Sequence, residues 1–142
     1  MVPYGIDKEK FFLQIERLRE HLRKIEEIKK KYKDEEILIP LLERNLHLAV
    51  ESCLNIGNHL ISGFGFKRPD TYKEIFKILK EEKVIKEEIA EKMIELVGFR
   101  NRLVHLYWKV EEKEVVERAN NLEIFDNFLK EVIKYLKEKR QI

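Results

Sequence analysis

Apolar residues recur at steps of three and four along most of this chain, the spacing that gathers side chains on one face of an α-helix. Over residues 7–32 they form one such stripe, with mostly polar positions between its members: Phe11, Ile15, Leu18, Leu22, Ile25, Ile28 and Tyr32. Asp7 precedes this stripe, where its carboxylate can accept a hydrogen bond from the first helical turn. The pattern predicts an amphipathic helix that ends before the polar break near Asp34.

A second helix is expected over residues 35–62, where another apolar stripe recurs: Leu42, Leu46, Ala49, Cys53, Ile56 and Leu60. Pro40 lies within this stretch, so that it either kinks the helix or marks its true first turn. The helix should end in the segment from Gly63 to Pro69, because glycine at a helix end and proline just beyond it are stop signals.

Three more helices complete the pattern. Thr71 is followed three residues later by Glu74, the arrangement of a capping box, which predicts a short helix from residue 71. A fourth helix is expected over residues 86–107, and a last one from about Glu114, with apolar positions as far as Leu136. These elements predict an all-α fold: an antiparallel bundle of four main helices plus one short helix, in a single domain over residues 1–142.

Arg100 occupies a position of the fourth helix where the period calls for an apolar residue. The stripe before it is apolar throughout: Ile89, Met93, Leu96 and Val97. A buried guanidinium without a partner is costly, so Arg100 must meet a carboxylate, an open cleft or a bound anion. Glu51 is the expected partner if the second and fourth helices pack together. An arginine whose charged end reaches solvent at a helix edge is the alternative interpretation.

Asn101 and His105 follow Arg100 on the same predicted helix. Residues four apart lie about 40° from one another around a helix, so Asn101 and His105 share a face. Arg100 and His105 are about 140° apart and separated by about 7.5 Å along the axis. The three side chains therefore span a broad arc, which suits one ligand if the helix end borders a cleft or meets a second copy of the chain. A histidine near a helix end can equally be a cap or a packed residue.

The second helix carries a ridge of polar residues: Glu43, His47, Glu51, Asn55, Asn58, His59 and Ser62. One interpretation is a solvated helix face. The other is that Asn58 and His59, near the end of this helix, face the same cleft as Arg100, with Glu51 beside them. The pattern leaves both interpretations open.

Composition limits the partners and the compartment. The 29 basic and 27 acidic residues leave a formal charge of +2, so any contact with RNA has to be local rather than spread over a basic surface. A single cysteine, Cys53, allows no intrachain disulfide, and neither a signal peptide nor a membrane span is apparent. We therefore expect a cytoplasmic protein. His47, His59 and His105 belong to no paired ligand motif, so that no metal and no other cofactor is expected.

The run from Arg100 to Tyr107 reads R-N-x-x-V-H-x-Y, which resembles the signature of HEPN proteins, particularly the HepT-like toxins of MNT–HEPN toxin–antitoxin systems. Two other segments also resemble this family. Residues 48–59 are similar to the long helix that precedes the motif, and residues 68–79 are similar to its short helix. The resemblance extends over about residues 40 to 125, which is most of the chain.

The resemblance implies an all-α homodimer in which two motifs form one composite ribonuclease site that works without a metal ion. His105 would act as general acid or base, Arg100 would bind the scissile phosphate, and Asn101 would orient the phosphate or the imidazole. RNA would be cleaved to 2′,3′-cyclic phosphate and 5′-hydroxyl ends.

The resemblance further implies a type VII-like toxin–antitoxin pair. Its partner would be a minimal nucleotidyltransferase antitoxin that AMPylates Tyr107 and forms a complex with the toxin. Two alternatives remain at this point. One is a non-catalytic HEPN dimer that serves as a binding platform for a nucleotidyltransferase. The other is a helical bundle without any chemistry, for which the match of Arg100, His105 and Tyr107 to the family would be a coincidence.

Overall fold

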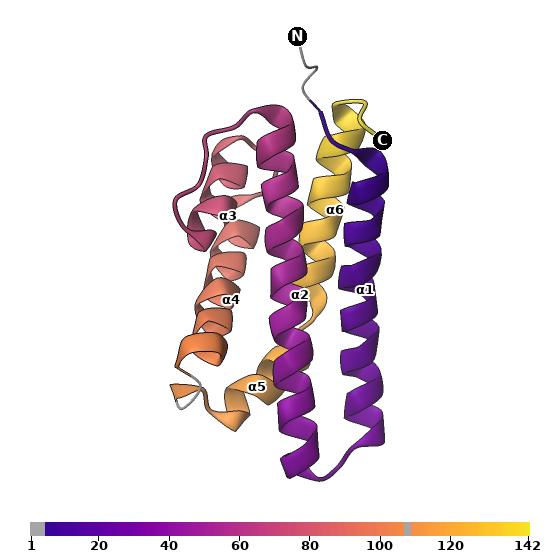
Figure 1. Ribbon diagram of the computed structural model, residues 1–142, viewed down its shortest axis with the longest axis vertical. Coiled ribbons are helices and arrows are strands. Elements are labelled where there is room, and N and C mark those ends of the chain that lie inside the picture. The colour runs from indigo at the N-terminus through magenta and orange to yellow at the C-terminus, as the bar shows by residue number, and fades with distance from the viewer. Residues whose placement is uncertain (1–4, 107–108) are drawn as a thin grey trace.

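The computed structural model describes residues 5–106 and 109–142. Within these residues the chain forms six α-helices and no strand (Figure 1). Their bounds are α1 Lys8–Lys31, α2 Glu35–Phe64, α3 Tyr72–Glu81, α4 Glu87–His105, α5 Glu112–Ala119 and α6 Glu123–Glu138. Helices α1, α2 and α6 run roughly along the long axis and the other helices pack beside them at an angle, so the predicted all-α bundle is confirmed.

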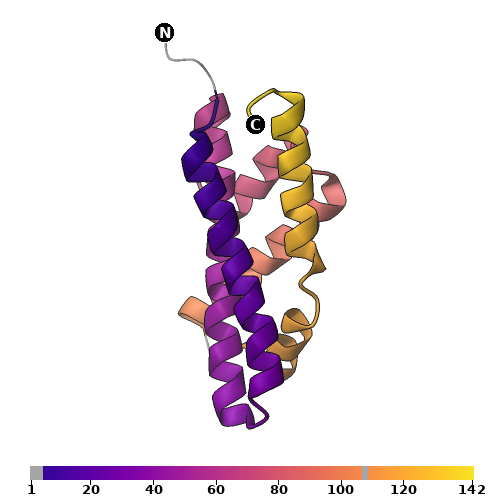
Figure 2. The ribbon, with the colours of Figure 1, turned by 90° about the vertical axis from the view of Figure 1, so that its right-hand side faces the viewer.

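Helices α1 and α2 form a long antiparallel hairpin that runs the length of the molecule (Figures 1 and 2). Asp7 caps α1 as predicted, because its Oδ1 accepts a hydrogen bond from the backbone N–H of Lys10 at 3.1 Å. Asp34 caps α2 in the same way, with Oδ1 accepting from the N–H of Glu36 at 3.0 Å. Since α2 begins at Glu35, Pro40 lies inside the helix and does not mark its first turn.

Helix α2 is the central element, packed against α1, α3, α4 and α5. Its buried residues belong to two apolar clusters. The larger cluster joins α1, α2, α3, α4 and α6 around side chains such as Phe11, Phe76 and Phe128. The smaller one packs the C-terminal half of α1 and the N-terminal half of α2 against α5 and the α4 residue Phe99. This second cluster fixes the C-terminal part of α4 against α2, which positions the motif that begins at Arg100.

The last predicted helix is in fact two helices, α5 and α6, separated at Asn120 to Leu122. Asn120 ends α5, and the side-chain Nδ2 of Asn121 donates a hydrogen bond to the backbone carbonyl of Glu117 at 2.7 Å. Asparagine favours such local hydrogen bonds over the helix interior. The apolar steps from Ala119 to Leu122 and on to Phe125 keep a helical spacing across the break. The periodicity therefore gave no sign of it.

The described parts of the two chain ends lie at the same end of the bundle (Figures 1 and 2). The backbone N–H of Ile6 donates to the side-chain Oε1 of Gln141 at 3.1 Å, which ties these segments together. Among the helices in residues 5–106 and 109–142, none combines the length and the apolar character that crossing a membrane requires.

Candidate functional site

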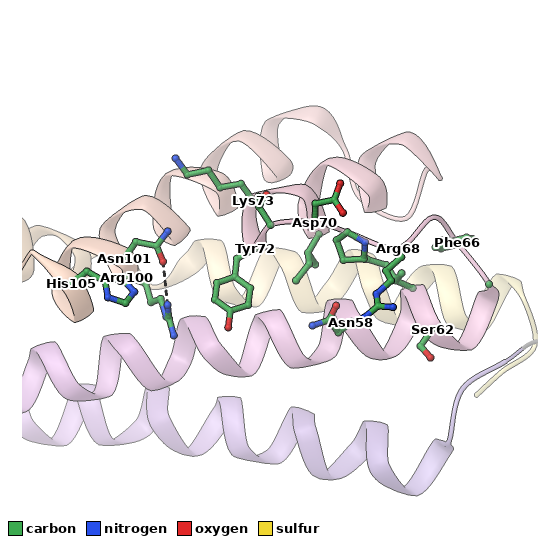
Figure 3. Close-up of a pocket in the computed structure, with 15 residues that line it drawn as sticks. Asn58, Ser62, Phe66, Arg68, Asp70, Tyr72, Lys73, Arg100, Asn101 and His105 are labelled. Carbon is green, nitrogen blue, oxygen red and sulfur yellow. Dashed lines mark hydrogen bonds between the residues drawn. The ribbon is translucent and has the colours of Figure 1, made fainter.

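An open cavity of about 1140 Å³ lies between α2, the connection that follows it, the start of α3 and the end of α4 (Figure 3). Gly65 makes this connection possible, because it ends α2 with φ 69° and ψ 30°, in the left-handed region that glycine adopts without strain. The chain then passes along the cavity to Thr71, which caps α3 by accepting from the N–H of Glu74 at 3.3 Å. Arg100, Asn101 and His105 all line this cavity, which is here called the α2–α4 pocket.

Arg100 is the buried charge of the α2–α4 pocket, with 8% of its surface exposed. Its Nη2 donates to Oε1 of Glu51 at 2.7 Å, and its Nη1 donates to Oδ1 of Asn101 at 3.1 Å. The predicted partnership with Glu51 is therefore present. The hydrogen bond from Arg100 lowers the pKa of Glu51, because it stabilises the ionised carboxylate. Within the described residues, Nε of Arg100 is buried and has no hydrogen-bond partner.

The guanidinium of Arg100 is held from three helices. Glu51 comes from α2 and Asn101 from α4 itself, while the Tyr72 ring comes from the first residue of α3. Cζ of Arg100 lies 5.1 Å from the centre of the Tyr72 ring, in a cation–π contact. This arrangement fixes the plane of the guanidinium, which prepares it to bind an anion in the pocket.

His105 lies at the last residue of α4 and is exposed where it lines the pocket. The helix ends there, with the N–H of Leu106 donating to the carbonyl of Arg102 at 2.9 Å. Arg102 in turn makes a bidentate ion pair with Glu114 of α5, at 2.6 and 2.8 Å. This pair anchors the end of α4 that carries His105. The sequence does not reveal this ion pair, because the two charges lie on different helices and no helical spacing relates them.

Of the three α2 residues predicted for the cleft, Asn58 lines the α2–α4 pocket, whereas Glu51 and His59 do not. The ring of His59 faces α1, where Nε2 accepts from the backbone N–H of Asp7 at 3.0 Å. Its Nδ1 lies 3.0 Å from Oε1 of Gln14, which it contacts as a donor when the ring is neutral. The prediction that His59 faces the cleft is therefore wrong. The physical reason is that neighbouring residues on a helix point about 100° apart, and this turn directs His59 to α1 while Asn58 stays on the side of the pocket.

Three further pocket residues were not predicted as functional: Arg68, Tyr72 and Lys73. The sequence offered the capping box at Thr71 as a sign that a helix begins here, but that signal concerns the backbone and says nothing of a pocket. Tyr107, predicted as the modification site, lies outside the described residues.

The described part of the chain offers neither a cluster of metal ligands nor a reactive thiol. Over residues 5–106 and 109–142, no group of three or more His, Cys, Asp or Glu side chains is arranged to hold a metal ion. Cys53 is fully buried on α2, and burial raises the pKa of its thiol, so that the group stays protonated and unreactive.

The sequence matches a family model described as "Ribonuclease HepT-like" over residues 13–132. The protein named "Putative RNase YutE" from Bacillus subtilis is 35% identical over 74 residues, which are 52% of this chain and 51% of that protein. The protein named mRNA nuclease HepT from Shewanella oneidensis is 30% identical over 91 residues, which are 63% of this chain and 68% of that protein. The matched segment thus spans about half the length of the Bacillus relative.

Solved structures show the same fold. The structure of YutE from Bacillus subtilis, described as a cytosolic protein of unknown function, has a TM-score of 0.83 and 26% identity, covering 98% of this chain and 96% of that one. A tri-AMPylated HEPN toxin of Shewanella oneidensis, in complex with its MNT antitoxin, has a TM-score of 0.80 and 23% identity, covering 88% and 96%. Because the family model matches most of this chain and the solved structures share its helical fold, this chain belongs to the HepT-like ribonuclease family.

Proposed function

We propose that this chain is the toxin of a type VII-like toxin–antitoxin pair and acts in the cytoplasm as a metal-independent endoribonuclease. The observation that carries the proposal is the convergence of Arg100, Asn101 and His105 on one pocket, with the arginine buried and held in a fixed orientation. Membership of the HepT-like family and the names of the relatives support the same activity.

The reaction that suits these groups is an intramolecular transesterification of the RNA backbone. A base removes the proton of a ribose 2′-hydroxyl, and the 2′-oxygen attacks the adjacent phosphorus. The bond from phosphorus to the 5′-oxygen breaks, and an acid protonates the leaving oxygen. The products are a 2′,3′-cyclic phosphate and a 5′-hydroxyl. Histidine serves either proton-transfer step near neutral pH, which is the role we assign to His105.

This chemistry needs both an acid and a base, and among the described residues that line the pocket His105 is the one imidazole. A homodimer that brings two His105 side chains to one cleft would supply both groups. The position of His105 at an exposed helix end is compatible with such a composite site.

We assign to Arg100 the binding of the scissile phosphate. A guanidinium binds phosphate through a planar fork of donors and stabilises the charge that develops in the transition state. Its Nε–H is buried and has no partner among the described residues, so this donor is not used by the pair with Glu51. Because Oδ1 of Asn101 accepts from Arg100, the amide Nδ2 of Asn101 remains to donate to a phosphate oxygen. Glu51 is a positioning residue, since it holds Arg100 and does not itself line the pocket.

We further propose that a minimal nucleotidyltransferase antitoxin inhibits the toxin by AMPylation of Tyr107. Tyr107 follows His105 by two residues, and an adenylate placed there would add negative charge beside a phosphate-binding site. The fold shared with an AMPylated HEPN toxin bound to its MNT antitoxin supports this mode of regulation.

A non-catalytic dimer that serves as a binding platform for the nucleotidyltransferase is the second candidate. The ion pair between Arg100 and Glu51, at 2.7 Å, favours it, because the pair already neutralises the guanidinium that the ribonuclease would use. The balanced composition, with a formal charge of +2, points the same way.

Cleavage of a mixed RNA by the purified protein in EDTA distinguishes the two candidates. The measurement compares the wild type with Arg100→Ala and His105→Ala, after mass spectrometry has shown that Tyr107 carries no AMP. Arg17→Ala and His21→Ala are matched controls on α1, outside the pocket. We expect cleavage by the wild type and both controls, cyclic phosphate ends on the products, and no cleavage by the two pocket variants. An unmodified wild type that leaves RNA intact would favour the platform.

The regulatory step has its own test. The toxin and its Tyr107→Phe variant are each incubated with the antitoxin and ATP, after which RNA cleavage is measured. We expect the wild type to gain AMP and lose activity while Tyr107→Phe remains active. Inhibition of the variant to the same extent as the wild type would rule out Tyr107 as the modification site.

A further inference from the structure

The α2–α4 pocket extends well beyond the three motif residues. Residues 68–73, which form the end of the α2–α3 connection and the start of α3, make up one side of it and are here called the α3 wall. The pocket volume of about 1140 Å³ exceeds the roughly 300–1,000 Å³ typical of small-ligand sites. A single phosphate group bound at Arg100 would leave most of this space empty, so the α3 wall has room to contact a larger substrate.

Charge is concentrated at this pocket. Its lining contains three permanently cationic side chains, Arg68, Lys73 and Arg100, against one carboxylate, Asp70. Because Glu51 neutralises Arg100 from behind the pocket, Arg68 and Lys73 against Asp70 leave an excess of one positive charge at the pocket surface. The balanced composition therefore conceals a local positive region of the kind that attracts a phosphate backbone.

The two cations of the α3 wall are available for binding. Arg68 and Lys73 are exposed, and neither has an ion-pair partner within residues 5–106 and 109–142. The Lys73 side chain lies beside Gly98 of α4, since a Cβ placed on Gly98 would be 3.9 Å from Nζ of Lys73. Both charges are thus free to meet an anion.

Tyr72 provides the aromatic surface of the α3 wall. It lines the pocket while 48% of its surface is exposed, in contrast to the fully buried aromatic residues of the core. In Figure 3 its ring stands between Arg100 and Asn101 on one side and Asn58 and Arg68 on the other. An exposed aromatic ring beside a phosphate-binding arginine is the arrangement with which proteins bind single-stranded nucleic acids.

We infer that the α3 wall is a binding subsite for single-stranded RNA, in which Tyr72 stacks on an unpaired base next to the phosphate held by Arg100. Lys73 and Arg68 bind phosphates of the flanking nucleotides. This inference deepens the proposed ribonuclease function and rests on it. A base inside a duplex is covered on both faces by its neighbours, so the subsite selects unpaired RNA.

Binding is measured by fluorescence anisotropy with a short labelled oligoadenylate, in a His105→Ala background that prevents cleavage. Tyr72→Ala should weaken binding about tenfold, within the range expected for the loss of one base–aromatic stack, and should leave the salt dependence unchanged. Tyr72→Phe should retain the affinity. Tyr32→Ala, at the far end of the α1–α2 hairpin, is the matched control.

The salt dependence of the affinity distinguishes the contribution of the two cations from that of the aromatic ring. Lys73→Ala and Arg68→Ala should each reduce the slope of log affinity against log salt concentration by about 0.7, the value for one phosphate contact to a single strand. Lys77→Ala, an exposed lysine on the same helix that does not line the pocket, should leave the slope unchanged.

An abasic strand of the same length tests whether Tyr72 acts on a base or only through Arg100. Stacking requires a base, so Tyr72→Ala should leave the affinity for the abasic strand unchanged. An equal loss for the abasic strand, an effect no larger than that of Tyr32→Ala, or no binding of oligoadenylate by the parent protein would each overturn the inference.

These outcomes are distinguishable from failure of the proposed activity. RNA cleavage in EDTA that depends on Arg100 and His105, combined with no effect of Tyr72→Ala, removes the subsite alone. Binding that depends on Tyr72 and on bases, by a protein that cleaves nothing, supports the subsite and removes the ribonuclease.

Discussion

Removal of Glu51 should show how much the bundle depends on the ion pair with Arg100. Arg100 is 8% exposed and donates to Glu51 at 2.7 Å, whereas the Glu51 side chain is 38% exposed. Loss of one partner of a fully buried pair costs about 3–5 kcal/mol. Because water reaches Glu51 and screens its charge, we reduce the expected coupling to about 1–2 kcal/mol. Glu51→Ala should lower the free energy of unfolding by about 2 kcal/mol, since the buried guanidinium then lacks its carboxylate.

The coupling is obtained from a double-mutant cycle of wild type, Glu51→Ala, Arg100→Ala and the double variant. Unfolding in urea is followed by circular dichroism at one protein concentration, so that any oligomer contributes equally to each curve. The matched control is the cycle for Glu20 and Lys24 on α1, which lie 3.3 Å apart with side chains 54% and 51% exposed. That exposed pair should couple by no more than about 0.5 kcal/mol.

The coupling should also depend on pH in a defined direction. Arg100 holds the pKa of Glu51 in the folded protein below its ordinary value of 4.5. The stabilisation is therefore fully present above pH 4.5 and is lost as the pH falls through the lowered pKa of the folded state. A coupling at neutral pH no larger than that of the Glu20–Lys24 pair, or one that persists after Glu51 is protonated, would refute this reasoning.

Three further predictions concern His59 and Gly57 of α2 and Gly98 of α4. Burial holds the pKa of His59 below 6.5, and its neutral ring accepts the N–H of Asp7. Stability from this contact is therefore present above pH 6.5 and lost as the pH falls through the lowered pKa. As the pH falls, the urea midpoint of the wild type should drop toward that of His59→Gln. Midpoints of the two proteins that change in parallel with pH would contradict this. Gly57→Ala should destabilise the fold by about 1–3 kcal/mol in the same assay, because the new Cβ would lie 2.5 Å from Cγ2 of Ile75 on α3. Gly98→Ala should instead stabilise α4 by up to about 1 kcal/mol, because alanine favours the helix more than glycine does and the new Cβ would meet no atom closer than 3.9 Å. Equal effects of the two substitutions on stability would count against the packing argument.

The partnership of Arg100 and Glu51 was predictable from the sequence because burial of a charge has few solutions. Arg100 interrupts an otherwise apolar stripe, so it requires a partner, and Glu51 lies on the polar ridge of the helix that packs against it. His59 lies on that ridge too, yet it faces α1 and contacts Asp7. The ridge spans more than one direction around the helix, and only the positions of the neighbouring helices decide which of its residues reach the pocket.

The sequence by itself determined the helices, because apolar spacing and capping residues act within a few positions of one another. It placed α1 to α4 close to their observed bounds and marked Arg100, Asn101 and His105 as one group. It did not show the break between α5 and α6, where the apolar spacing continues across Asn120 and Asn121.

Only the tertiary structure decided what surrounds the motif. Tyr72 is brought to Arg100 because Gly65 ends α2 in a left-handed conformation and α3 then packs back against α2 and α4. Arg102 reaches Glu114 across the boundary between two helices. Such contacts depend on how elements cross in space, and no local periodicity encodes that. The residues of the motif were therefore recognisable in the sequence, whereas the shape and charge of the pocket were set by packing.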